Sequence, residues 1–191
     1  MKKVITICFL VFMFACGEEH LPKPKAFLRL DYPKPEYYQV ETNLPFTFEK
    51  NKLAVDVYKV KTTASGTSQS IDLEYHKLKG TIYLTYKKVL KNNLNTYLLD
   101  AQNITQKHTI KADEIVEQPF INAKEMVYGM FYEVGGNAAS QSQFYLTDSI
   151  NHFVTGSLYF YVKPNYDSIL PAADYLKNDI RHIMESLKWK E

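Results

Sequence analysis

The sequence predicts an α+β domain in which helices pack on an antiparallel sheet. Three observations favour this class. Several short segments alternate apolar and polar side chains at every second residue, which is typical of half-buried strands. Two longer segments repeat apolar side chains at spacings of three and four, which is typical of amphipathic helices. The strands predicted in the second half follow one another through short turns, and short turns favour antiparallel pairing.

The first half of the chain contains the first group of predicted strands, which are 26–32, 53–58, 71–77 and 82–86. We expect 26–32 to be an edge strand that ends at Pro33, because proline cannot donate a ladder hydrogen bond. A short loop at 65–68, which contains Gly and Ser, separates the second strand from the third.

Two segments have the spacing of a helix. In the first, which starts near Asn92, the apolar stripe consists of Leu94, Leu98, Ala101, Thr105 and His108. In the second, which ends near Trp189, the stripe consists of Ile169, Ala173, Leu176, Ile180, Ile183 and Leu187. We expect Asp167 or Ser168 to cap the second helix, and Pro171 is tolerated in its first turn.

A three-stranded meander is predicted between the two helices. Its strands are 125–134, 139–147 and 152–162, and its turns are 135–137 and 148–151. Gly135 and Gly136 supply the positive φ that a tight hairpin needs. The order of elements resembles the sandwich of the photosystem protein PsbP, and this resemblance implies a domain used for binding rather than catalysis.

Composition and charge exclude several classes of function. The chain has 191 residues, of which 46% are hydrophobic and 23% charged, so we expect one folded domain. Lys and Arg number 23 against 21 Asp and Glu, and without Lys2 and Lys3 the balance is zero. This balance argues against a nucleic-acid partner, which needs a clustered basic surface. The glycine motifs that cradle dinucleotides or nucleoside triphosphates are absent.

The amino terminus has the pattern of an exported, lipid-anchored protein. A basic pair and a short apolar run predict a signal peptide over 1–15. Ala15-Cys16-Gly17 resembles a bacterial lipobox, at which Cys16 is lipidated and becomes the new amino terminus. We therefore expect a lipidated tether over 16–25 and a single globular domain over 26–191. In bacterial lipoproteins, Asp directly after the lipidated cysteine favours retention in the inner membrane. Here that position is Gly17, so we expect the protein in the outer membrane, with the domain facing the periplasm.

Two features of the mature chain follow from this reading. Cys16 is its only cysteine, so no internal disulfide can form. The acidic pair Glu18-Glu19 has two interpretations: part of a surface-export signal of the kind gliding bacteria use, or a solvated tether.

The candidate catalytic and metal-binding residues are few. The five histidines lack the spacings that place two imidazoles on one metal. Asp179, His182 and Glu185 share a helix face and could form half of a metal site, but we expect them on the solvated flank. The chain has no GxSxG nucleophile elbow. We assign no catalytic residue, no metal site and no cofactor.

Aromatic residues are the one compositional excess, with 15 tyrosines. Strand residues such as Phe144, Tyr145 and 159–161 are predicted to place rings on both faces of the sheet. The rings away from the core either form a contact surface for a protein or glycan, or are half-exposed strand tyrosines without a partner. Two Asp-Ser-Ile triplets, 148–150 and 167–169, match an O-glycosylation pattern of gliding bacteria, and helix capping is the alternative for the second.

Four blocks of the sequence carry a resemblance to a known family. They are 21–33, 44–49, 128–140 and 144–167, the last containing Leu146-Thr147-Asp148-Ser149, His152-Phe153 and Gly156-Ser157-Leu158-Tyr159-Phe160. Together they resemble the gliding-motility lipoprotein GldD family. The resemblance implies a non-enzymatic outer-membrane lipoprotein that is required for gliding and linked to the type IX secretion machinery. Its partners are then other motility and secretion proteins and, through lipid, the membrane; Cys16 is the only functional residue it supplies.

Two other functions remain open at this point, a lipid-anchored envelope hydrolase and a carrier of a small ligand. A hydrolase would need a deep pocket with convergent polar groups and perturbed titration. A carrier would need an apolar cavity between helices and sheet. A scaffold would instead present an aromatic or apolar patch with a polar rim.

Overall fold

The computed structural model describes residues 30–55, 60–64, 66–90, 92–162 and 165–190. Its main element is a seven-stranded antiparallel sheet with the order β4-β5-β6-β10-β9-β8-β7. The strands are β4 (Lys61–Thr62), β5 (Ser68–Tyr75), β6 (Gly80–Lys88), β7 (Ala112–Asn122), β8 (Val127–Gly136), β9 (Ser140–Thr147) and β10 (His152–Phe160). The predicted α+β class is confirmed.

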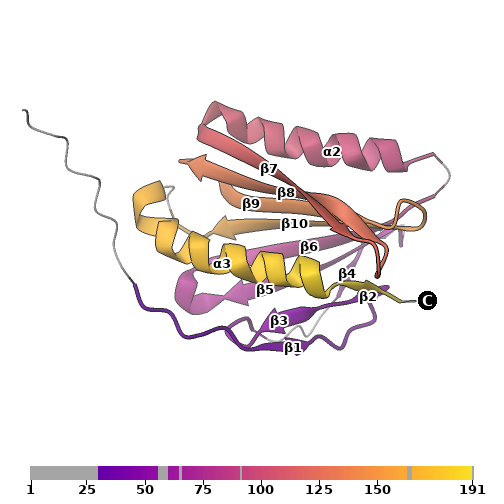
Figure 1. Cartoon of the computed structure of the whole chain (residues 1–191), viewed down its shortest axis with the longest axis horizontal. Helices are drawn as coiled ribbons and strands as arrows, with labels where there is room; N and C mark the ends of the chain where they lie inside the picture. The colour runs from indigo at the N-terminus through magenta and orange to yellow at the C-terminus, as the bar shows by residue number, and fades with distance from the viewer. Residues whose placement is uncertain (1–29, 56–59, 65, 91, 163–164, 191) are drawn as a thin grey trace, which may run out of the picture.

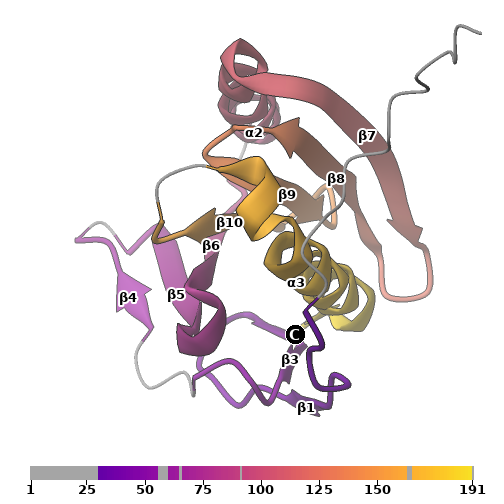
Figure 2. The same ribbon diagram turned by 90° about the vertical axis from the view of Figure 1, so that its left-hand side faces the viewer.

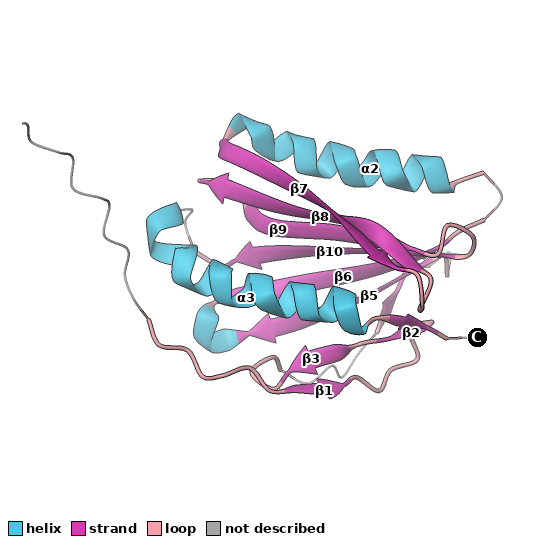
Figure 3. Ribbon diagram, in the orientation of Figure 1, coloured by secondary structure: helices cyan, strands magenta, loops and turns pink. Residues whose placement is uncertain are grey.

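Two small sheets and two helices complete the domain (Figures 1 and 3). The small sheets pair β1 (Tyr37–Gln39) with β3 (Glu49–Asn51), and β2 (Phe46–Thr47) with β11 (Lys188–Trp189). The helices are α2 (Leu94–Gln106) and α3 (Tyr166–Ser186), and the 3₁₀ turns are η1 (His76–Leu78) and η2 (Lys107–Ile110). No described helix is long and apolar enough to cross a bilayer.

The large sheet curves around α3, which lies in its hollow (Figure 2). Strands β1 and β3 close the open side of this hollow, and α2 lies on the opposite face of the sheet (Figure 2). Successive side chains of β5 and β6 point to opposite faces of the sheet. The aliphatic residues on one face therefore all point into the hollow and are buried; they are Ile71, Leu73, Ile82 and Leu84. The buried stripe of α3 packs against them, as its predicted spacing requires.

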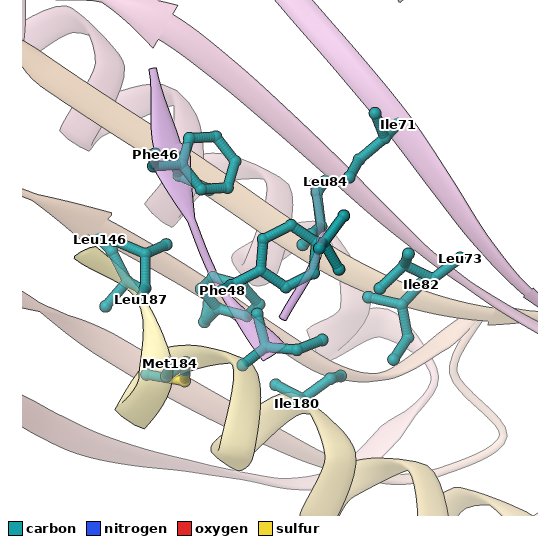
Figure 4. Packing of buried hydrophobic residues seen from close by; sticks show 14 of the residues in the cluster. Phe46, Phe48, Ile71, Leu73, Ile82, Leu84, Leu146, Ile180, Met184 and Leu187 are labelled. Atoms are coloured by element: carbon teal, nitrogen blue, oxygen red, sulfur yellow. The ribbon is translucent and has the colours of Figure 1, made fainter. Parts of the chain in front are cut away.

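The main core fills this hollow. Figure 4 shows how side chains from β2, β5, β6, β9 and α3 converge on it, among them Phe46, Leu146, Ile180 and Met184, together with Phe48, which precedes β3, and Leu187, which follows α3. Each fully buried side chain of this size contributes roughly 1.5–3 kcal/mol of hydrophobic stabilisation. A protein without disulfides in its described domain can therefore be held by this core.

A smaller cluster attaches α2 to the other face. Val89, Ala101 and Phe153 are its buried members, with four partly buried neighbours, Leu94, Tyr97, Leu98 and Tyr145. Beyond it, the Thr105 hydroxyl donates to Gln143 Oε1 at 2.9 Å, and the Gln143 amide lies 2.7 Å from His108 Nε2. The predicted stripe of this helix is thus the face that meets the sheet.

Two predicted strands, 26–32 and 53–58, are wrong in their described parts. Residues 30–32 form no strand, and Tyr32 instead packs its ring on Tyr175 of α3 at 5.1 Å; residues 26–29 lie outside the described part. Residues 53–55 form no strand either, because the Leu53 amide donates to Asn51 Oδ1 and closes a turn. Residues 56–59 are not described. The strand that exists near here, β3, precedes the predicted one.

The helix cap also differs from the prediction. The N-cap of α3 is Asn165, and neither Asp167 nor Ser168 occupies that position. The first helical amide, Tyr166 N–H, donates to the Asn137 side-chain oxygen at 2.9 Å. The hairpin turn after Gly136, whose φ is +92°, therefore holds the start of α3. The meander itself is confirmed, since β8, β9 and β10 pair in sequence. Its first turn lies at 137–139 rather than 135–137, because both glycines belong to β8 and Gly136 alone of the two has a positive φ.

Candidate functional site

The predicted lipid-attachment residue, Cys16, lies outside the described residues, so its acylation stays a prediction. The described chain begins at one end of the domain and runs along α3 (Figure 1). Tyr175 of α3 donates its hydroxyl to the Pro33 carbonyl at 3.0 Å. Residues 30–39, which connect any anchor to the domain, are thus held against this helix.

A buried polar cluster, which we call the clasp, fixes this segment to the core. It consists of Tyr37, Asn51, Tyr175 and Asp179. The Asp179 carboxylate accepts hydrogen bonds from the Tyr37 hydroxyl at 2.7 Å and from the Asn51 amide at 3.0 and 3.1 Å. The same amide donates to the Tyr175 hydroxyl at 3.0 Å. The clasp therefore joins β1, β3 and α3, which are far apart in the sequence.

Asp179 was expected on the solvated flank of the last helix, and this expectation is wrong. Only 1% of its surface is exposed. Burial raises the pKa of its carboxyl group, although the hydrogen bonds it accepts act in the opposite direction. Burial and the neighbouring carboxylate also raise the pKa of Tyr37. Removal of water disfavours the charged forms of both groups, and the negative charge of the Asp179 carboxylate further disfavours ionisation of Tyr37.

His182 and Glu185 do not join Asp179 in a metal site. The His182 ring stacks on Tyr37 with centroids 3.6 Å apart, and its Nε2 lies 2.8 Å from Glu49 Oε2. Glu185 is exposed. Among the described residues, no three His, Cys, Asp or Glu side chains form a group that could hold a metal ion.

Tyrosine rings gather on the sheet face that carries α2, as the strand pattern predicted. Tyr83 of β6 and Tyr159 of β10 make an edge-on contact at 5.9 Å. The Tyr161 hydroxyl lies 2.6 Å from that of Tyr83, and the Thr81 hydroxyl donates to it at 3.1 Å. Tyr161 is 64% exposed. These phenols bond to one another, so part of this face is internally satisfied.

A second exposed surface lies where three loops of the large sheet meet the carboxy-terminal segment. We call it the loop end and define it by Leu90, Ile121, Met126, Ile150 and Trp189. The four aliphatic members are 52%, 74%, 59% and 68% exposed, respectively. In Figure 1 these loops lie near the carboxy terminus, at the end of the domain opposite the start of the described chain.

Hydrogen bonds and a ring contact join the loops that carry Leu90, Met126 and Ile150 to Trp189. The Val89 amide donates to the Asn151 carbonyl at 2.8 Å, which places Leu90 and Ile150 on neighbouring loops. The His152 ring stacks on Trp189, the only tryptophan, with centroids 5.0 Å apart. The Trp189 indole donates to the Met126 carbonyl at 3.1 Å. Burial lowers the pKa of His152, which favours its neutral form beside the indole.

The turn that carries Ile150 is rigidly built. Asp148 Oδ1 accepts hydrogen bonds from three successive backbone amides, those of Ile150, Asn151 and His152, at 2.8–2.9 Å. These hydrogen bonds confirm the turn predicted at 148–151. They also fix the backbone that carries the exposed Ile150. Ser149 of the first Asp-Ser-Ile triplet is exposed, as is Ser168 of the second.

The described domain has one large groove and several small cavities. The groove, of 620 Å³, lies open along α2 between Lys87, Asp100, Ile104 and Ile110. Cavities of 40 Å³ beneath α2 and 130 Å³ beside α3 are much smaller. Tyr37, Asn51 and Asp179, the clasp residues with buried polar groups, line none of them. The clasp, in which the pKa values of Tyr37 and Asp179 are raised, therefore lies away from these cavities.

The class that these features define is an α+β domain with exposed apolar and aromatic surfaces and an amino-terminal segment that is hydrogen-bonded to its last helix. The chain belongs to the gliding motility lipoprotein GldD family, whose model matches residues 17–189. Membership gives it a role in gliding motility and, as a lipoprotein, an association with a membrane through lipid. The searches of curated proteins and of solved structures found no match. The resemblance to PsbP stays a prediction.

Proposed function

We propose that this protein is a non-catalytic scaffold of the gliding and type IX secretion machinery, anchored to the outer membrane through Cys16 and facing the periplasm. Its loop end then contacts another protein of that machinery. The observation that carries the proposal is the position of the loop end, which is apolar, continuous and remote from the start of the described chain.

Exposure and composition support a protein partner at the loop end. Single exposed apolar side chains are ordinary, whereas neighbouring ones around a half-buried tryptophan are typical of contact surfaces. The rim contains exposed Lys88, Lys124 and Lys188. Glu125 lies 3.8 Å from Lys124 and 3.6 Å from Lys188, so its charge is shared between them. A partner with an apolar patch and an acidic rim matches this surface.

The two alternative functions have less support. A hydrolase would place its perturbed acids in accessible space, whereas Asp179 is enclosed by its hydrogen-bond partners. A small-ligand carrier would need an apolar chamber between helix and sheet. The cavities beneath α2 and beside α3 measure 40 and 130 Å³, below the roughly 300–1,000 Å³ of pockets that enclose small ligands.

Cys16→Ala tests the anchor. We expect the protein to move from the membrane fraction to the soluble fraction and gliding to be lost, because stable attachment needs acyl chains. Fractionation, motility assays and mass spectrometry of the mature amino terminus provide the measurements. Cys8→Ala is the matched control, since that cysteine lies within the predicted signal peptide. Unchanged attachment and gliding in Cys16→Ala would overturn the anchor.

A photo-crosslinking residue at position 150 tests the contact. We expect it to capture a motility or secretion protein in intact cells, and we expect Ile150→Glu to abolish gliding at unchanged protein level. Position 110 is the matched control, because Ile110 is 85% exposed but follows α2 at the other end of the sheet. A phospholipid adduct at position 150, or equal capture at both positions, would refute the contact. Turnover of an envelope substrate by the purified protein would refute the scaffold.

A further inference from the structure

The 130 Å³ cavity beside α3 contains an arginine without an anionic partner. Arg181 is the only arginine in the described part of the chain. Its guanidinium lies 4.9 Å from the centre of the Phe131 ring, and Nη2 donates to Gln118 Oε1 at 2.7 Å. The Nε atom is buried and has no hydrogen-bond partner. Nη1 makes no hydrogen bond to a described residue either, but it is not buried, so the end of the guanidinium fork is free to accept a ligand.

Lys177, one turn earlier on α3, differs from Arg181 because its charge is paired. Its ammonium lies 2.6 Å from Glu133 Oε1 and 3.1 Å from Asp174 Oδ1, so its charge is compensated within the domain. Arg181 forms no ion pair with any described residue. A buried donor of a charged group is costly to leave unpaired, and the guanidinium fork matches a carboxylate in shape.

The walls of this cavity are apolar. Pro119 and Phe120 of β7, Phe131 of β8 and Met184 of α3 line it beside Arg181. Pro119 is exposed and β7 is the last strand of the sheet, so the cavity opens toward an approaching molecule. An apolar cavity on the order of 150 Å³ accepts a benzene-sized group. A cavity of 130 Å³ thus suits a side chain the size of valine or leucine.

We propose that this cavity binds an apolar side chain that carries or adjoins a carboxylate, presented by the protein partner of the loop end. The inference rests on the proposed function. The carboxylate accepts hydrogen bonds from Nη1 and from the second Nη2–H of Arg181, while the apolar group packs on Phe120, Phe131 and Met184. Glu185, one turn after Arg181, also lines the cavity, and its negative charge opposes binding of an acid without pairing with Arg181.

The test uses the purified full-length lipoprotein in detergent, with 4-methylpentanoate as the probe and uncharged 4-methylpentanamide as its matched control. The Arg181 Nε–H and the Met184 methyl are followed by NMR. We expect saturable shifts with the acid and at least tenfold weaker binding of the amide. Arg181→Lys should weaken binding of the acid at least fivefold, because an ammonium lacks the planar fork.

Two further variants separate this site from a general loss of structure. Glu185→Gln should keep or strengthen binding of the acid, and Lys177→Gln should leave it unchanged. Equal affinity for acid and amide, or no saturable shift of Met184, overturns the proposal. If the probe fails while position 150 still captures a partner, the cavity assignment falls and the scaffold stands. If the probe binds but position 150 captures no partner, the cavity assignment stands and the scaffold falls.

Discussion

Asp179→Ala is expected to lower the free energy of unfolding by about 3 kcal/mol, since it leaves buried donors without an acceptor and opens a small void. Asn51 is 1% exposed and its amide cannot turn to water. Tyr37 loses the partner of its hydroxyl at the same time. Urea denaturation followed by circular dichroism measures the change.

Asp174→Ala is the matched control for this variant. Asp174 lies on the same helix but is exposed, with its carboxylate 3.1 Å from Lys177. An exposed ion pair contributes about 0.5 kcal/mol or less, so the control should unfold almost as wild type does. Equal destabilisation by the two variants would show that the clasp does not stabilise the fold.

The raised pKa of Asp179 adds a second readout to the same position. The folded state holds this proton at a higher pH than the unfolded chain, whose carboxyl titrates near 3.8. The stability that this carboxyl group contributes therefore increases as the pH falls from above the raised pKa toward 3.8, and it is absent well above the raised pKa. The stability difference between wild type and Asp179→Asn should grow over that interval. A constant difference would mean that the accepted hydrogen bonds cancel the effect of burial.

The clasp also determines how an anchor would act on the domain. Tyr32, Pro33 and Tyr37 all contact α3, through Tyr175 and Asp179. The helix in turn is enclosed by the large sheet and carries much of the core. Tension on a lipid tether would therefore reach the centre of the domain rather than a peripheral strand. The loop end, at the other end of α3, would keep its shape under such tension.

The helices and the meander could be predicted because their signals are local. The stripe through Ile169, Leu176 and Ile183 defines one face of α3 whatever it packs against. Strand β7 could not be predicted, because most of its residues are exposed and Pro119 interrupts its pattern. The small sheet of β1 and β3 was missed for a related reason, since segments of three residues carry no measurable period.

A candidate site could be predicted from the sequence only where adjacent residues form its motif. Cys16 has this property, because a lipobox is a short motif. Asp179 does not, since its partners Tyr37 and Asn51 are 142 and 128 positions away. The loop end depends on the register of the β7–β8 and β9–β10 hairpins and on the β6–α2 loop, and this arrangement brings Met126 to Trp189. The isoleucine within the predicted turn at 148–151, which is exposed in the structure, was the one sequence feature that pointed to this surface.

Gly129→Ala should be among the most destabilising single substitutions in the sheet. A Cβ atom at this position would lie 1.9 Å from the Tyr145 backbone oxygen and 2.9 Å from its carbonyl carbon. Neither atom can move without separating β8 from β9, the pairing that holds the loop end in register. Overpacking of this kind costs about 3 kcal/mol, near the upper part of the usual range.

Thermal unfolding measures this cost against Gly135→Ala in the same strand. For a domain of this size, about 3 kcal/mol corresponds to a fall in Tm of roughly 6–12 °C. At Gly135 the nearest atom to a new Cβ is Glu114 Cγ at 3.3 Å, the stem of a flexible exposed side chain. That substitution should change stability by less than about 1 kcal/mol, because the glutamate can move and alanine restricts the unfolded chain. Similar melting temperatures for the two variants would show that β8 and β9 can separate locally at little cost.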